Sequence, residues 1–325
     1  MTPLVGNERA REALTRAVNT GPLHHAWLLA GPEGVGKGMF ARAAALRMLA
    51  QAADPTLPPG IDVPANHRIA HLFAAGSHPD YRELARLPKD ADKPGENLAR
   101  SITIDQVRGL QRLFTTKPSL SERRVILIDA VDDLERAGAN ALLKNLEEPP
   151  AGTVFLLVSH APGRLLPTIR SRCRLLRFDA LSDAQVRGVL NRALDDAPPE
   201  EVDALVRAGG GSPGRALGFA GLELAALDGD MAELADTGDR SNAVRIRLSR
   251  ALGPKSAQPR YEAFLERAPG FIAARARTRS GPALVEALDA YQAAQDLAGA
   301  ALGLSLDASA TVFEMAGLIA RLAPR

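Results

Sequence analysis

Near its amino end the chain carries the segment Gly31-Pro32-Glu33-Gly34-Val35-Gly36-Lys37-Gly38. This segment follows a short apolar run, residues 26–30, and precedes a stretch with helical periodicity, residues 37–50. A glycine-rich turn between a buried strand and a helix is the setting of a P-loop, in which backbone N–H groups surround phosphates. We therefore predict a phosphate-binding loop on a parallel sheet, and its binding residues would be Gly31, Gly34, Gly36 and Lys37.

The final position of this P-loop departs from the pattern. Ser or Thr normally stands there and holds Mg²⁺ through its hydroxyl, whereas this chain has Gly38. A second buried strand, residues 125–128, ends on Asp129, which we predict as the acidic residue beside the loop. The alternative for Asp129 is a cap at the strand end or a surface ion pair, and the sequence leaves both open.

Apolar strands alternate with helices along the first half of the chain. The expected strands are residues 26–30, 125–128, 154–158 and 174–178. This alternation predicts a parallel α/β sheet with right-handed crossovers. Two capping boxes, which begin at Thr103 and at Ser182, predict the starts of helices.

After Phe178 the strand pattern ends and helical periodicity continues to the last residue. We expect breaks between helices at Gly253-Pro254, Pro269-Gly270 and Gly281-Pro282. The predicted fold class is therefore α/β plus all-α, divided into an α/β domain over 1–178 with an insertion at about 51–80, a small helical domain over 179–221, and a larger helical domain over 222–325.

Composition limits the classes of function. The 40 Lys and Arg nearly balance the 38 Asp and Glu, which argues against a purely electrostatic nucleic-acid binder. The single cysteine, Cys173, excludes an internal disulfide and a cysteine-based zinc site. No signal peptide and no apolar run of about 18 residues is found, so we expect a cytoplasmic protein without a membrane partner.

Ser171-Arg172-Cys173 precedes the last expected strand. Arg172 is either a solvated arginine or an arginine that stabilises the charge building on a transferred γ-phosphate, and Arg170 could share that role. Cys173 is equally consistent with a small buried apolar residue.

Four segments together carry a family resemblance. They are Gly31 to Lys37, the helix Asn140-Ala141-Leu142-Leu143-Lys144-Asn145-Leu146-Glu147-Glu148-Pro149-Pro150, Ser171-Arg172-Cys173, and Gly211-Ser212-Pro213-Gly214-Arg215-Ala216. The combination resembles the bacterial DNA polymerase III clamp-loader subunits of the AAA+ family, densely over residues 1 to about 220. His24-His25-Ala26-Trp27 and Gly76-Ser77-His78-Pro79-Asp80 resemble the delta-prime type within that family.

The resemblance implies an AAA+ core, a helical lid and a helical collar that joins a five-subunit ring. It implies gamma/tau and delta subunits as partners, and contact with the sliding clamp and primed DNA through the assembly. It also implies that Arg172 acts in trans on a neighbouring ATPase subunit, that Arg215 is the sensor-2 residue, and that Ser159-His160 falls at sensor 1.

Two departures from the family pattern matter. Active AAA+ subunits carry a glutamate after the strand-end aspartate, whereas this chain has Ala130. Gly38 and Ala130 together weaken any binding of ATP with Mg²⁺, and we expect little or no hydrolysis by this chain. The family often carries a four-cysteine zinc module, but the insertion here has no cysteine; His67, His71 and His78 alone do not predict zinc.

The preferred hypothesis is a largely inactive subunit that completes a neighbour's ATP site. The alternatives are an active ATPase subunit of the gamma/tau type, a branch-migration motor, and a scaffold that binds no nucleotide. No set of paired carboxylates suits two-metal nucleotidyl transfer, so any polymerase activity would belong to the holoenzyme.

Overall fold

The computed structural model describes residues 4–20, 23–89, 98–304 and 306–324. The chain divides into two compact units, and each is described by itself. The first unit comprises residues 1–185 and 211–214, and the second comprises 186–210 and 215–325. Gly21-Pro22, where the sequence predicts the end of the first helix, lies outside the described residues.

The first unit is built on a five-stranded parallel sheet. Its strands are β1 (Ala26–Ala30), β2 (Tyr81–Leu84), β3 (Arg124–Asp129), β4 (Thr153–Ser159) and β5 (Arg174–Arg177), in the order β2-β3-β4-β1-β5. The four strands expected from the sequence are confirmed. The sequence analysis missed β2, because Tyr81-Arg82-Glu83-Leu84 lacks the continuous apolar run of a central strand and lies at the sheet edge.

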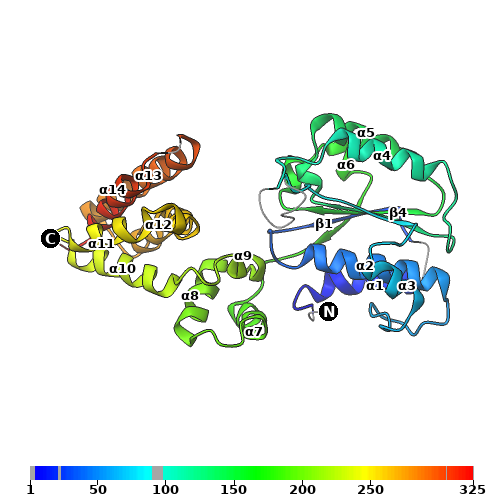
Figure 1. The fold of residues 1–325 in the computed structure, drawn as a ribbon, viewed down its shortest axis with the longest axis horizontal. Helices are drawn as coiled ribbons and strands as arrows, with labels where there is room; N and C mark the ends of the chain where they lie inside the picture. Colours follow the sequence, from blue (N-terminus) through cyan, green and yellow to red (C-terminus); the bar gives the residue numbers. More distant parts are fainter. Residues whose placement is uncertain (1–3, 21–22, 90–97, 305, 325) are drawn as a thin grey trace. The chain divides into compact units, whose positions relative to one another are not determined.

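Helices cover both faces of this sheet (Figure 1). One face carries α1 (Glu8–Thr20), α2 (Lys37–Ala53) and α3 (Arg68–Ala74), and the other carries α4 (Ile104–Phe114), α5 (Arg136–Glu147) and α6 (Pro167–Arg170). Apolar side chains of α4 and α5, such as Val107 and Leu142, pack with Ile126 and Phe155 of the sheet in one buried cluster. Full burial of each such side chain contributes roughly 1.5–3 kcal/mol.

Local signals place several of these helices correctly. The capping box at Thr103 is present: its side chain accepts from the Gln106 N–H, and the Gln106 side chain accepts from the Thr103 N–H. The box at Ser182 likewise pairs with Gln185. The insertion expected at about 51–80 contains one regular element that the sequence analysis did not predict, the short helix α3.

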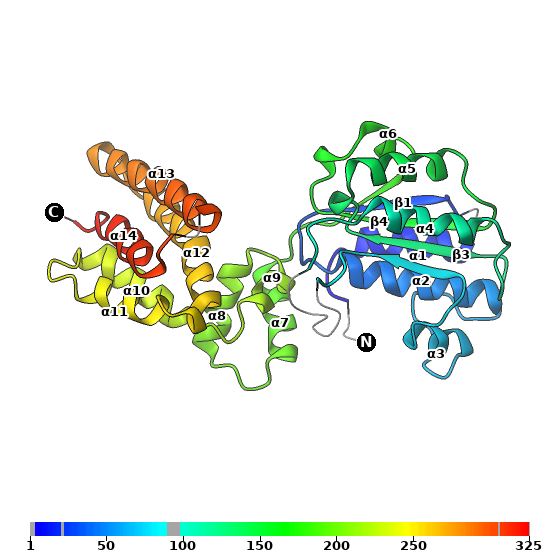
Figure 2. The same cartoon turned by 45° about the horizontal axis from the view of Figure 1, so that its top comes forward.

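The second unit is helical. Its elements are α7 (Asp183–Ala193), α8 (Pro199–Gly209), α9 (Pro213–Gly218), α10 (Leu224–Thr237), α11 (Ala243–Leu252), α12 (Gln258–Ala276), α13 (Gly281–Leu304) and α14 (Ala308–Ala320), of which α7 and α9 begin in the first unit. Within it, α11 packs against α14 and α12 against α13, as Figure 2 shows. The expected break at Pro269-Gly270 was wrong, because α12 continues through Pro269. Phe264 and Ile272 are fully buried on either side, and this packing outweighs the hydrogen bond that proline removes.

The expected fold class, an α/β core with a parallel sheet plus all-α segments, is confirmed. The domain limits at residues 178 and 221 stay predictions. None of the helices in the described ranges is both long and apolar enough to cross a membrane.

Candidate functional site

The predicted P-loop joins β1 to α2 and depends on its glycines. Gly34 and Gly36 have φ values of 75° and 95°, which glycine adopts far more readily than other residues. A Cβ on Gly31 would lie 1.9 Å from the carbonyl oxygen of Phe178, so only glycine fits there. No atom would lie within 4 Å of a Cβ on Gly36, which leaves space beside the first turn of α2.

Lys37, the first residue of α2, is only 2% exposed. Its Nζ donates to the carbonyl oxygen of Gly31 at 2.7 Å and also to that of Pro32. Burial lowers the pKa of Lys37 to about 8, although Asp129 and Asp132 partly oppose the shift. The ammonium group thus closes the loop on itself, and a bound phosphate would have to replace these two carbonyls.

The first turn of α9 packs directly on the P-loop. The Gly214 N–H donates to the carbonyl oxygen of Gly34 at 2.9 Å, and a Cβ on Gly214 would lie 2.8 Å from the Gly34 Cα. Sequence reasoning noted this turn only for its resemblance and missed the contact. The next residue, Arg215, forms an ion pair with Glu266 inside the second unit.

Asp129 stands at the carboxyl end of β3, as predicted, and lies beside Gly38. Its Oδ2 is 3.3 Å from the Nη2 of Arg42, one turn further along α2. Burial raises the pKa of Asp129, and Arg42 opposes the rise. Sequence reasoning missed Arg42, but its spacing of four residues from Gly38 places both on one face of a helix and could have identified it.

The acidic residues after Asp129 are occupied by structural contacts. Asp132 accepts from the Ser159 hydroxyl at 2.9 Å and from the backbone N–H of His160 at 2.7 Å. Asp133 pairs with Arg86 at 3.1 Å. Ala130 is buried and has no acidic group. Both aspartates are therefore engaged by groups of this chain itself.

The residues present fit a nucleotide's phosphates but not its magnesium ion. The glycines and Lys37 supply donors for phosphate oxygens. Magnesium prefers oxygen ligands in a near-octahedral arrangement, whereas Gly38 contributes none and Asp129 faces a guanidinium.

Two of the three histidines of the insertion, His67 and His78, have other partners. The Nδ1 of His67 accepts from the Ile69 N–H at 3.2 Å, and the Nδ1 of His78 accepts from the Asp80 N–H at 3.1 Å. No group of three or more potential metal ligands occurs among the residues that the structure describes.

Arg172 lies between α6 and β5, with a side chain one-third exposed. Its Nη2 is 2.7 Å from Glu147 and its Nη1 donates to the Thr168 carbonyl. Because β5 runs parallel to β1, Arg172 lies at the amino ends of these strands, whereas the P-loop follows the carboxyl end of β1. Between Arg174 and Arg177 alone the strand advances about 10 Å, at ~3.3 Å per residue. Arg172 and the P-loop therefore lie at opposite ends of the parallel strands.

Cys173, next to Arg172, packs against the buried apolar cluster. Burial raises the pKa of its thiol to about 12, which leaves it protonated and unreactive at neutral pH. This agrees with the role of a small apolar residue.

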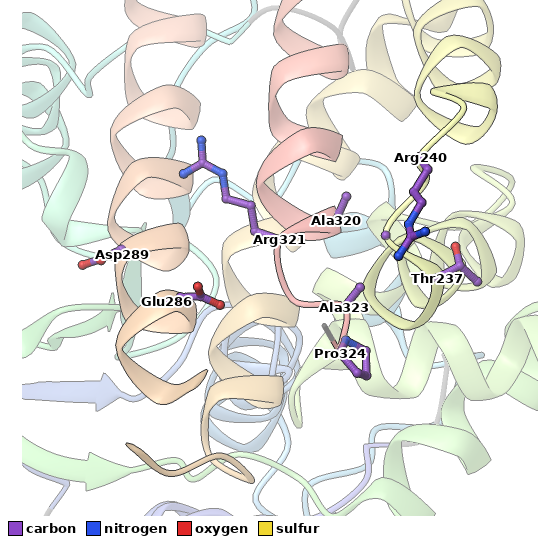
Figure 3. A pocket seen from close by; sticks show the side chains of 9 residues that line it. Thr237, Arg240, Glu286, Asp289, Ala320, Arg321, Ala323 and Pro324 are labelled. Carbon is purple, nitrogen blue, oxygen red and sulfur yellow. The ribbon is translucent and has the colours of Figure 1, made fainter. Parts of the chain in front are cut away.

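A cavity of about 460 Å³ lies in the second unit (Figure 3). Figure 3 shows Glu286 and Asp289 on α13, Arg321 at the end of α14, and Arg240 after α10. The two acidic and two basic side chains select neither an anion nor a cation, so this cavity does not define a site.

A protein family and several individual proteins resemble this chain. The family model described as DNA polymerase III, delta subunit, matches residues 6–182. DNA polymerase III subunit delta' of Pseudomonas aeruginosa is 40% identical over 189 residues, which cover 58% of this chain and 53% of that protein. Subunit delta' of Escherichia coli is 34% identical over 206 residues, 63% of this chain and 57% of that protein.

The gamma/tau subunit of Mycobacterium tuberculosis is 32% identical over 255 residues, 77% of this chain and 39% of that protein. The chain thus spans about half the length of the delta' relatives it matches, and less of the gamma/tau relative. Among solved structures, a DNA polymerase III gamma subunit-related protein of Thermotoga maritima aligns with 96% of this chain and 98% of its own, at a TM-score of 0.42 and 18% identity.

Proposed function

Because the chain belongs to the family of DNA polymerase III delta subunits, we propose that it is a clamp-loader subunit of the delta-prime type. In this role it helps to load the sliding clamp on primed DNA, in a cytoplasmic five-subunit ring with gamma/tau and delta subunits. Residues 1–178 would be the AAA+ core, 179–221 the lid, and 222–325 the collar. It contributes Arg172 to a neighbour's ATP site and hydrolyses little ATP itself.

The position of Arg172 is the observation that carries this proposal. It lies at the amino ends of the strands, whereas the P-loop of its own chain lies at their carboxyl ends. Any phosphate that Arg172 contacts would therefore be bound by another subunit. Phosphoryl transfer builds negative charge on the γ-phosphate oxygens, and an arginine donated from outside the site accelerates it by ~10³–10⁵ in known cases. Glu147 and the Thr168 carbonyl hold the guanidinium in place before such a partner binds.

The low hydrolysis has a separate physical basis. The loop lacks the hydroxyl that holds magnesium, and Ala130 stands where a catalytic glutamate would be. Asp129 and Lys37 remain as nucleotide-binding candidates, and Arg215 as a sensor. The similarity to gamma/tau subunits favours a second candidate, an active ATPase subunit. Gly38 and Ala130 argue against it, because both substitutions remove groups that hydrolysis needs.

Reconstitution with the neighbouring subunits tests the proposal. We expect Arg172→Ala to leave the chain folded and assembled but to abolish turnover at the one site that it serves, which lowers DNA-stimulated hydrolysis. Arg164→Ala, which changes an exposed arginine of the same chain, is the control and should retain activity. Arg170→Ala tests separately whether that arginine shares the role of Arg172. An assembly whose hydrolysis and clamp loading are the same with Arg172→Ala would refute the donated arginine. Hydrolysis by the isolated chain that Lys37→Ala abolishes would instead support the gamma/tau alternative.

A further inference from the structure

The corner between the P-loop helix and the end of β3 is filled by side chains of this chain. A Cβ on Gly38 would lie 2.3 Å from the Asp129 Oδ2 and 3.1 Å from the Arg42 Nη1. A serine or threonine at position 38 would therefore require the Asp129 carboxylate to move from its present position. Glycine at position 38 leaves the space in which Asp129 and Arg42 meet, so the missing hydroxyl is linked to this pair.

Arg42 is held in this corner by acidic residues of two strands. Its Nε lies 3.1 and 3.2 Å from the two carboxylate oxygens of Glu83 on β2, and its Nη2 is 3.3 Å from Asp129 on β3. The Tyr81 hydroxyl donates to Glu83 at 2.8 Å and fixes that carboxylate in turn. Although burial opposes its charge, the hydrogen bond and attraction of Glu83 hold the pKa of Arg42 above its ordinary value. The guanidinium is thus a permanent, oriented cation.

The free edge of this guanidinium faces the P-loop. Nη1, the nitrogen nearest Gly38, has no hydrogen-bond partner among the described residues, whereas Nε and Nη2 are both engaged. A planar guanidinium with a free N–H pair matches the geometry of phosphate oxygens. A divalent cation beside it would meet a like charge and would find no ligand on Gly38.

We propose that this P-loop binds a nucleoside di- or triphosphate without a divalent metal ion, and that Arg42 supplies the positive charge that the metal supplies elsewhere. The backbone N–H groups of the loop and Lys37 hold the phosphates, and Arg42 is the residue that determines metal independence. This inference rests on the proposed nucleotide binding and is independent of the donated Arg172.

Calorimetric titration of the full chain with ADP tests it directly. The affinity should be the same within about twofold in EDTA and in Mg²⁺. Arg42→Gln should weaken ADP binding in EDTA by at least about tenfold, the effect of losing a hydrogen bond to a charged group, and Arg42→Lys should restore part of it. Arg86→Gln is the matched control, because Arg86 pairs with Asp133 and not with Asp129 or Glu83, and it should bind ADP as the unchanged protein does.

Each other outcome overturns the inference. Binding that requires Mg²⁺ would show that a metal site survives, and an absence of binding at millimolar ADP would show that the loop is closed. Unchanged affinity in Arg42→Gln would remove Arg42 from the site. Trp27 fluorescence checks that each variant is folded, since this tryptophan is fully buried in β1. Arg172→Ala should leave ADP binding unchanged, so failure here leaves the donated arginine untouched.

Discussion

Replacing Asp80 should destabilise the first unit strongly. Its buried carboxylate accepts from the Ser119 N–H at 2.8 Å and from the Leu120 N–H at 2.9 Å. It also lies 3.9 Å from the Nη2 of Arg124, and both side chains are 1% exposed. Asp80 ends the Gly-Ser-His-Pro-Asp segment, so this segment holds the turn at 116–120 and the start of β3 rather than any ligand.

The magnitude follows from these contacts. Hydrogen bonds to a charged group contribute about 1.5–3 kcal/mol each, so two backbone donors account for roughly 3–6 kcal/mol. Removing one member of a buried ion pair costs about 3–5 kcal/mol, because the other charge is left without compensation. Both ranges include about 4 kcal/mol, which is the loss in free energy of unfolding that we expect for Asp80→Ala. Asp80→Asn keeps one acceptor oxygen and should cost less.

Urea unfolding followed by Trp27 fluorescence measures this effect. Trp27 is the only tryptophan of the chain and is fully buried in β1, so its signal reports the first unit. With a slope of about 2–3 kcal/mol per molar urea, the midpoint of Asp80→Ala should fall by roughly 1–2 M. Adding Arg124→Met removes the uncompensated charge and should recover at least about 1 kcal/mol.

Asp105→Ala is the control, because Asp105 pairs with Arg108 at 3.7 Å on an exposed helix surface. The urea midpoint of Asp105→Ala should equal that of the unchanged protein. A loss below about 1 kcal/mol for Asp80→Ala would refute the reasoning, since buried donors cannot lose their acceptor so cheaply. So would a double variant no more stable than Asp80→Ala, because that result would remove the buried charge from the argument.

Three further predictions concern the P-loop and the fold around it. Burial lowers the pKa of Lys37 to about 8, so its charge is present below pH 8 and is lost as the pH rises through 8. The ADP affinity measured by calorimetry should therefore fall by about tenfold per pH unit above pH 8. Gly214→Ala places a Cβ 2.8 Å from the Gly34 Cα, so it should cost about 1–3 kcal/mol in urea unfolding and weaken ADP binding. Thr103→Ala removes the capping box with Gln106 and should cost about 1 kcal/mol by the same assay, without changing ADP affinity.

Matched variants separate these effects from general damage. Lys37→Arg keeps its charge at high pH, so a pH profile that still falls above 8 would assign the titration to another group. Gly163→Ala meets no atom within 4 Å and should leave stability and binding unchanged. A Gly214→Ala protein that binds ADP normally would show that the contact with Gly34 does not shape the loop.

Local signals in the sequence determined most of the fold of the first unit. Continuous apolar runs identified β1, β3 and β4, because strands buried on both faces exclude polar side chains. The edge strand β5 is mostly exposed and was expected from the short apolar pair Leu175-Leu176. The glycine spacing and Lys37 identified the P-loop, since positive φ values and close backbone approach admit only glycine. The capping box at Thr103 located the start of α4 to the residue.

Elements that are stabilised mainly by their neighbours were not predicted from the sequence. The polar strand β2 exists because β3 pairs with it at the sheet edge, and α12 continues through Pro269 because buried side chains on both sides hold it. Intrinsic propensity is weak against such tertiary contacts.

The chemistry of the site divides in the same way. The sequence alone showed which groups were missing, since the absence of a hydroxyl at Gly38 and of a carboxylate at Ala130 can be read from residue identity. Only the tertiary structure showed what fills the space. Arg42, Glu83 and Asp129 come from a helix and two strands, and meet because parallel β2 and β3 bring their carboxyl ends together beneath α2. Periodicity reports which face of an element is buried, but not which side chains of separate elements come within hydrogen-bonding distance.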